Sequence, residues 1–283
     1  MNMLEAMSAR VSTRSFGAEN FSREEMRELA ARLSAAQGET APFGSKVRLA
    51  LYESGDGGKP VKLGTYGLIS GASAFIVPAV PAGPGALEDT GYILEKAVLE
   101  ATALGFSSCW IGGVFSRGKA AEVVGATRGE LVPSVIALGK PAARRSLADR
   151  IVTGAAKSRS RKPMELIAFT LGEASLQEPW LSVVSAVRGA PSASNKQPWR
   201  LLRLAGGGEW LLFLDEDKVY NNSLGEVHIQ NLDMGIAMRH FFEAAKAASL
   251  QGGWSPVSTG QDRLKSALLF GEARGWKPIS LWK

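Results

Sequence analysis

An internal repeat is the feature of this sequence that most constrains its fold. Two segments of 22 residues, 89–110 and 233–254, both begin with Asp-x-Gly, both end in Trp, and lie 144 residues apart. Chance similarity between two helices is one interpretation. The interpretation we prefer is a duplicated α+β unit whose copies pack across a pseudo-two-fold axis, so that one chain resembles a fused dimer.

Hydrophobic periodicity supports an α+β fold in both halves. Ser22 and Glu25 form a capping-box pattern at the start of an amphipathic helix. The helix over 89–106 is apolar nearly all round, so we expect it at the centre of the fold. We place a first half at 1–170 and a second half at 171–283. Further helices are expected at 4–10, 181–187 and 233–250, and strands at 46–53, 72–80, 132–139, 199–204 and 210–217.

Composition narrows the class of protein. The chain has 283 residues, of which 45% are hydrophobic, but it has no run of 18 apolar residues, so we expect no membrane span. The amino terminus lacks the apolar core of a signal peptide, and the lone Cys109 cannot form an intrachain disulfide. Both features indicate the cytoplasm. The two histidines lie in no metal-ligand spacing, so we expect no metal site.

A basic segment carries the net charge. Residues 140–162 hold eight Lys or Arg and one acid, whereas the whole chain has a net charge of only +6. A nucleic-acid binder usually spreads its charge over a wider face, and no aromatic residues interleave with these charges to stack on bases. We therefore expect no nucleic-acid partner; a solvated linker and an anion site both remain open.

Two polar stretches have the composition of ligand sites. Arg10, Ser12 and Arg14 alternate, so in an extended chain all three side chains point the same way and can reach one anion. The loop GAPSASNKQPW (189–199) sets hydroxyl and amide side chains between two rigid prolines. Those side chains suit a ring edge with N–H and C=O groups, such as that of a flavin. The alternatives are an exposed charged loop and a loop that caps its own backbone.

A glycine pair follows a third apolar stretch, CWIGGVF (109–115), and lets the backbone approach a flat ligand closely. The adjoining GVFSRGK matches the spacing of a phosphate loop, but Ala120 stands where a Ser or Thr must bind Mg²⁺. A nucleoside triphosphatase is therefore disfavoured.

Taken together, the RxSxR motif, the PSxSNxQPW loop, the WIGG turn and a late RKP resemble the FMN-dependent nitroreductase family. The arrangement is similar to the single-chain tandem branch of that family, the TM nitroreductases, over nearly the whole chain. The resemblance implies a nitroreductase-like α+β fold with two pseudo-symmetric halves in one chain. In the family, FMN lies at the interface of a domain-swapped homodimer.

The resemblance also implies FMN contacts. Arg10 would face the phosphate and Arg14 the pyrimidine end of the ring, while Gly112 and Gly113 would lie beside N5. Arg159 and Arg161 match the late basic pair on the phosphate, and Thr65 matches a ring-edge position. The full implied set is Arg10, Ser12, Arg14, Thr65, Gly112, Gly113, Arg159, Arg161, Pro191, Ser192, Asn195 and Gln197.

The distribution of the motifs departs from the family. A family subunit usually carries both the Arg cluster and the loop, whereas here the cluster lies in the first half and the loop in the second. The chain is therefore expected to form one complete FMN site as a monomeric pseudo-dimer, with a homodimer as the alternative. The implied activity transfers hydride from NAD(P)H through FMN to a small nitroaromatic, quinone or similar acceptor. No side chain is expected to be catalytic, and a flavin-binding protein without turnover is the alternative.

Overall fold

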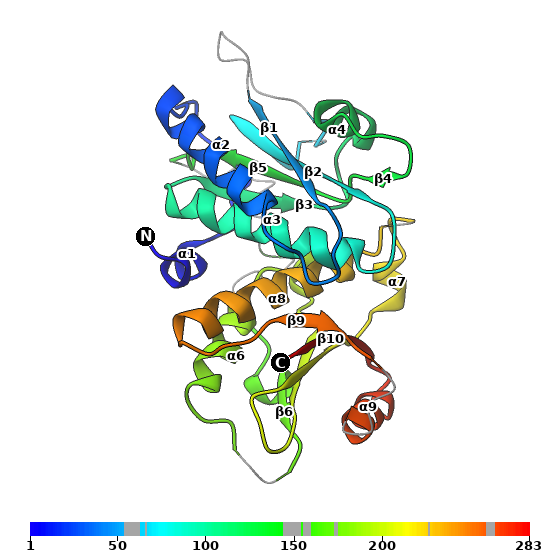
Figure 1. The fold of residues 1–283 in the computed structure, drawn as a ribbon. Helices are drawn as coiled ribbons and strands as arrows, with labels where there is room; N and C mark the ends of the chain where they lie inside the picture. Colours follow the sequence, from blue (N-terminus) through cyan, green and yellow to red (C-terminus); the bar gives the residue numbers. More distant parts are fainter. Residues whose placement is uncertain are drawn as a thin grey trace.

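The fold consists of two sheets with a pair of long helices between them (Figure 1). The computed structural model describes residues 1–53, 63–65, 67–143, 154, 160–172, 175–225, 227–258 and 264–283. Much of the basic segment, including the predicted site residue Arg159, lies outside the described residues.

The first sheet is antiparallel, in the order β1-β2-β5-β3, with the short β4 also paired to β2. Helices α1, α2 and α4 belong to the same half (Figure 1). The bounds are α1 Met3–Ala9, α2 Arg23–Gln37, β1 Arg48–Glu53, β2 Ala74–Pro81, β3 Ser107–Ile111, α4 Arg117–Val124, β4 Glu130–Leu131 and β5 Val135–Gly139.

The second sheet repeats this order. Strands β7-β8-β10-β9 pair antiparallel, so when the short β4 and the edge strand β6 are left out, the first, second, fourth and third strands are neighbours in both sheets. Strand β6 adds to the edge of β7 in parallel and precedes the predicted boundary at Leu171; the boundary itself stays a prediction. The bounds are β6 Ala168–Thr170, α6 Trp180–Gly189, β7 Trp199–Arg203, β8 Trp210–Leu214, α7 Lys218–Asn221, β9 Trp254–Pro256, α9 Lys265–Glu272 and β10 Lys277–Trp282.

Helices α3 (Ala86–Ala103) and α8 (Ile229–Ala247) cross between the sheets, where Figure 1 shows them one above the other. Their contacts are reciprocal: a Cβ on Gly91 would lie 2.1 Å from the Leu232 carbonyl oxygen, and one on Gly235 would lie 1.9 Å from the Glu88 carbonyl oxygen. Each contact repeats the other after 144 residues. The halves are therefore related by a pseudo-two-fold axis at this crossing, and only glycine allows the backbones to approach so closely.

The core of the second half is aromatic. Phe241 on α8 lies within 4.9–5.9 Å, centroid to centroid, of the rings of four tryptophans, Trp180, Trp210, Trp254 and Trp282. Large rings supply most of the buried apolar area here, and tilted or edge-to-face packing suits their charge distribution. This cluster fixes α8 on the second sheet.

Most predicted elements are present. The capping box of α2 forms between Ser22 and Glu25, and α3 is buried along almost its entire length, as expected for a central helix. The structure starts α3 three residues and α8 four residues before the expected positions, at Ala86 and Ile229. Cys109 is buried, in agreement with a core role.

Candidate functional site

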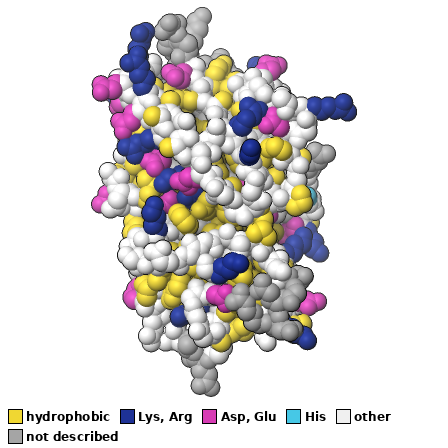
Figure 2. Space-filling view, viewed as in Figure 1, with side chains coloured by type: hydrophobic (Ala, Val, Ile, Leu, Met, Phe, Trp, Pro, Cys, Tyr) yellow, Lys and Arg dark blue, Asp and Glu magenta, His cyan; other side chains and the backbone are white. Residues whose placement is uncertain are grey.

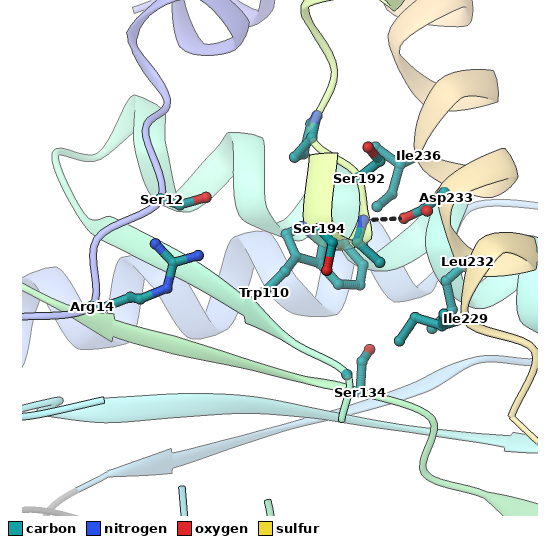
Figure 3. Close-up of a pocket in the computed structure, with 13 residues that line it drawn as sticks. Ser12, Arg14, Trp110, Ser134, Ser192, Ser194, Ile229, Leu232, Asp233 and Ile236 are labelled. Atoms are coloured by element: carbon teal, nitrogen blue, oxygen red, sulfur yellow. Dashed lines mark hydrogen bonds between the residues drawn. The ribbon is translucent and has the colours of Figure 1, made fainter. Parts of the chain in front are cut away.

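A cavity lies where the first half meets the second, beside the amino-terminal part of α8 (Figure 3). Its volume of about 110 Å³ is below the roughly 300–1,000 Å³ of most small-molecule pockets, so a large ring enters only if lining side chains shift. The first half contributes Ser12, Arg14, Trp110, Gly112 and Ser134; the second contributes Pro191, Ser192, Ala193, Ser194, Ile229, Leu232, Asp233 and Ile236.

The RxSxR stretch is held as an extended strand beside β3. Ser12 forms a parallel bridge with Ser108, and the Thr13 N–H donates to the Ser108 carbonyl at 2.8 Å. Extended backbone turns alternate side chains to one side, and Ser12 and Arg14 accordingly both line the cavity. Arg10 donates to the Ser12 hydroxyl at 3.5 Å. The predicted common orientation of this motif is therefore confirmed for Ser12 and Arg14.

The PSxSNxQPW loop brings its first residues to the cavity and turns its later ones back into the protein. Pro191 and Ser192 line the cavity. Gln197 is 3% exposed, accepts from the Lys162 N–H at 2.8 Å and donates to Asn195 Oδ1 at 3.1 Å. The Asn195 and Gln197 amides fasten the loop to residues 160–162, a separate segment of the chain.

The loop holds an unusual backbone. Ser194, Asn195 and Gln197 have φ of 48°, 55° and 47°, in the left-handed region that costs a non-glycine residue about 1–2 kcal/mol. Hydrogen bonds compensate: the Gln197 N–H donates to the Ser192 hydroxyl at 2.9 Å, and Ser194 pairs with the Tyr220 hydroxyl at 2.8 Å. Strain of this kind clusters where a segment is shaped for a ligand.

Three guanidinium groups gather beside the loop. Arg161 donates to Asn195 Oδ1 at 3.4 Å and to the Gly189 carbonyl at 3.1 Å. Burial lowers the pKa of Arg161, and the positive charges of Arg10 and Arg188 lower it further. Like charges in this proximity repel one another, and an anion with several oxygens would satisfy them together. Arg161 thus bonds Asn195 of the second half and lies within electrostatic range of Arg10 of the first.

The rest of the cavity wall combines apolar side chains with buried polar atoms. The indole N–H of Trp110 donates to Glu95 Oε2 at 2.8 Å, which sets the orientation of the ring. Ser134 Oγ and Asp233 Oδ2 are buried and have no hydrogen-bond partner among the described residues. Burial raises the pKa of Asp233 well above its usual value, although the Ala193 N–H opposes this. A bound polar ring is one group that would satisfy such atoms.

The remaining predicted residues lie at different distances from the cavity. Gly112 lines it, and a Cβ there would lie 1.9 Å from Ile229 Cδ1, so a larger residue would have to displace the end of the Ile229 side chain. Gly113 faces Leu224 instead, and the Thr65 hydroxyl donates to the Ile69 carbonyl within its own turn, at 3.5 Å. Neither residue lines the cavity. The roles of all these residues toward a cofactor stay predictions.

Sequence reasoning did not select several residues of this site. Trp110 lies outside the implied set of cofactor contacts, but it is half-buried and lines the cavity. Arg188 and Ser134 carry no local motif. The sequence does single out Asp233, because this residue begins the second copy of the repeat.

Figure 2 shows one side of the molecule, which carries charges of both signs. Lys and Arg side chains are scattered among Asp and Glu on the side shown in Figure 2. Among the described residues, no helix combines the length and apolar character needed to cross a bilayer.

Comparisons with known proteins identify the family and the fold. The family model described as "Putative TM nitroreductase" matches residues 2–245. A "putative nitroreductase" from Thermotoga maritima superposes with a TM-score of 0.59 at 20% identity, covering 100% of this chain and 93% of that one, a likeness that shows the fold. A nitroreductase with bound FMN from Desulfitobacterium hafniense is 20% identical over 51% of this chain and 92% of its own, with a TM-score of 0.38. Curated proteins give no match.

Proposed function

Because the chain belongs to the TM nitroreductase family, we propose that it is an FMN-dependent oxidoreductase that passes hydride from NAD(P)H to a small-molecule acceptor, such as a nitroaromatic compound or a quinone. One observation carries the proposal: Ser12 and Arg14 of the first half line the same cavity as Pro191 and Ser192 of the second. These are the two motifs that a nitroreductase needs for its cofactor, and they lie about 180 residues apart in the sequence.

The donor set fits a flavin mononucleotide. Arg10, Arg161 and Arg188 form a cationic cluster suited to a phosphate, because a guanidinium can bind two phosphate oxygens at once. Ser12, Arg14 and Ser134 lie where the polar edge of a ring would need hydroxyl and guanidinium partners. Ile229, Leu232 and Ile236 supply the apolar wall that keeps water from the ring.

FMN supplies the hydride chemistry when bound, so no side-chain nucleophile or general base is required. The protein's own contribution is binding, orientation and electrostatics. Arg14 places a positive charge at the cavity, where it favours a ligand that gains negative charge on reduction. Trp110, fixed by Glu95, presents an indole to the same space.

Aromatic side chains lie at positions pseudo-symmetric to parts of the cavity wall, which supports one flavin per chain. In the first half, the loop after α2 places Phe43 against Gly85, where a Cβ would lie 2.4 Å from Phe43 Cγ. Trp254, the counterpart of Trp110, is 8% exposed and packs edge-on against Trp282 at 5.6 Å. We therefore propose that one chain makes one site and works as a monomer, because both halves of the site belong to the same polypeptide.

The decisive experiment measures flavin content and turnover in the purified protein. After reconstitution with FMN, we expect one flavin per chain and anaerobic loss of the 450 nm absorbance band on adding NADH or NADPH. Adding a quinone or nitroaromatic should restore the band. A protein that binds FMN but keeps its absorbance with both nucleotides would be the binding protein without turnover, and one that binds no FMN would refute the proposal.

A further inference from the structure

Asp233 is a buried carboxyl with only one of its oxygens accounted for. The side chain belongs to α8, is 2% exposed and lines the cavity (Figure 3). Oδ1 accepts a hydrogen bond from the Ala193 N–H at 2.9 Å. Oδ2 has no partner within the described part of the chain. A buried polar atom without a hydrogen bond costs free energy of folding, so the unpaired Oδ2 needs an explanation.

The pseudo-symmetric residue Asp89 shows which hydrogen bonds an aspartate at this position makes when it only holds a loop in place. It occupies the same place in α3 and accepts from the Phe43 N–H through Oδ1 and the Ser45 N–H through Oδ2, both at 2.8 Å. In both halves, then, this aspartate fastens the loop that follows the preceding helix. Loop fastening uses both oxygens of Asp89 but only Oδ1 of Asp233, and the oxygen left over belongs to the side chain that faces the cavity.

The surroundings of Asp233 favour its neutral form. Burial raises its pKa well above the usual value, and only the Ala193 N–H opposes that shift. The nearby titratable or charged groups are Arg14 on the cavity wall, Tyr220 beside the loop and Glu88 on α3; Tyr220 pairs with Ser194, and Glu88 accepts from Asn231 at 2.6 Å. Because Oδ1 already accepts a hydrogen bond, a proton on this carboxyl would be carried by Oδ2, which would make Oδ2 a donor.

We propose that Asp233 contacts the ligand directly: Oδ1 fastens residues 191–195, and Oδ2–H donates a hydrogen bond to an acceptor atom on the ring of the bound flavin. The inference rests on the proposed function and adds a specificity-determining residue to it. It also connects the ligand to the loop, because one carboxyl holds both. A ring without an acceptor atom at this edge should bind more weakly.

The test combines flavin binding with infrared spectroscopy. Asp233→Asn keeps an oxygen for Ala193 and an N–H₂ donor for the ligand, so its Kd for FMN should stay within about threefold of the wild-type value, whereas Asp233→Leu should raise Kd tenfold or more. The wild-type protein should show a protonated-carboxyl C=O band that shifts when FMN binds. That band should be absent in Asp233→Asn and retained in the matched control Asp89→Asn.

The outcomes separate the two proposals. Wild-type protein that binds no FMN overturns both. Wild-type protein that binds FMN but has no such band, or has one that FMN leaves in place, overturns the assignment of Asp233 alone, as does a tenfold loss of affinity in Asp233→Asn. Should Asp233→Leu fail to fold, the protonated-carboxyl band still tests the assignment of Asp233, through its shift with FMN in wild type and its absence in Asp233→Asn.

Discussion

Replacing Gly235 with alanine should separate the two halves of the molecule at their closest approach. A Cβ at this position would lie 1.9 Å from the Glu88 carbonyl oxygen and 2.6 Å from the Tyr92 nitrogen. Both are backbone atoms of α3, so no side-chain rotation relieves the clash. Helices α3 and α8 must move apart by about 1.5 Å to restore ordinary contact distance.

The magnitude follows from two opposing terms. Overpacking of a tight core costs about 1–3 kcal/mol, and a clash with several backbone atoms of α3 puts this site at the upper end. Alanine gains about 1 kcal/mol over glycine inside a helix. We therefore expect Gly235→Ala to lower the free energy of unfolding by about 2 kcal/mol.

Gly118→Ala is the matched control. Gly118 also lies in a helix, α4, but a Cβ there would meet no atom within 4 Å, so only the gain in helix propensity applies. The assay is urea unfolding followed by far-ultraviolet circular dichroism. If Gly235→Ala were as stable as Gly118→Ala, the close crossing of α3 and α8 would not be what joins the halves.

Two further predictions concern the phosphate end of the site and acid stability. Arg10→Gln should raise the Kd for FMN about tenfold or more while leaving the Kd for riboflavin, which lacks a phosphate, nearly unchanged. Fluorescence titration measures both Kd values, and substitution of the exposed Arg27 by Gln is the control. An equal loss of affinity for both flavins would contradict the phosphate role of Arg10. The Arg48 guanidinium and the Thr127 N–H lower the pKa of Glu130 to about 2, from 4.5. The stabilisation by ionised Glu130 is thus complete above about pH 4.5 and disappears as pH falls toward 2. The difference in free energy of unfolding between wild type and Glu130→Gln, measured by urea titration, should therefore shrink over that range. A difference that stays constant with pH would contradict the lowered pKa of Glu130.

The sequence predicted the fold well because its signals are local. The capping box at Ser22, the apolar helix over 89–106 and the alternating strands each arise from neighbouring residues. The internal repeat predicted that the two halves pack across a pseudo-two-fold axis, and the glycines of its two copies meet where α3 and α8 cross. The carboxyl-terminal α9 and β10 had no clear periodicity and were not predicted.

The candidate site was predictable only where its residues are adjacent in sequence. Ser12 and Arg14, or Pro191 and Ser192, act as short motifs whose side chains turn to one side together. Composition alone does not distinguish an amide that faces a ligand from one that bonds a neighbouring segment, and Gln197 accepts a hydrogen bond from the Lys162 N–H. Arg188, Ser134 and Asp233 reach the site only through packing between distant segments.

The reciprocal crossing of α3 and α8 takes place within one polypeptide, and this frees the two halves from having to match. In a homodimer with the same packing, every substitution appears on both sides of the axis. Here Phe43 stands in one loop where the small Ala193 stands in the other, and Ala193 lines the cavity. One half is thereby free to change toward tighter packing and the other toward ligand binding. Because both halves belong to one chain, they stay in a one-to-one ratio at any protein concentration.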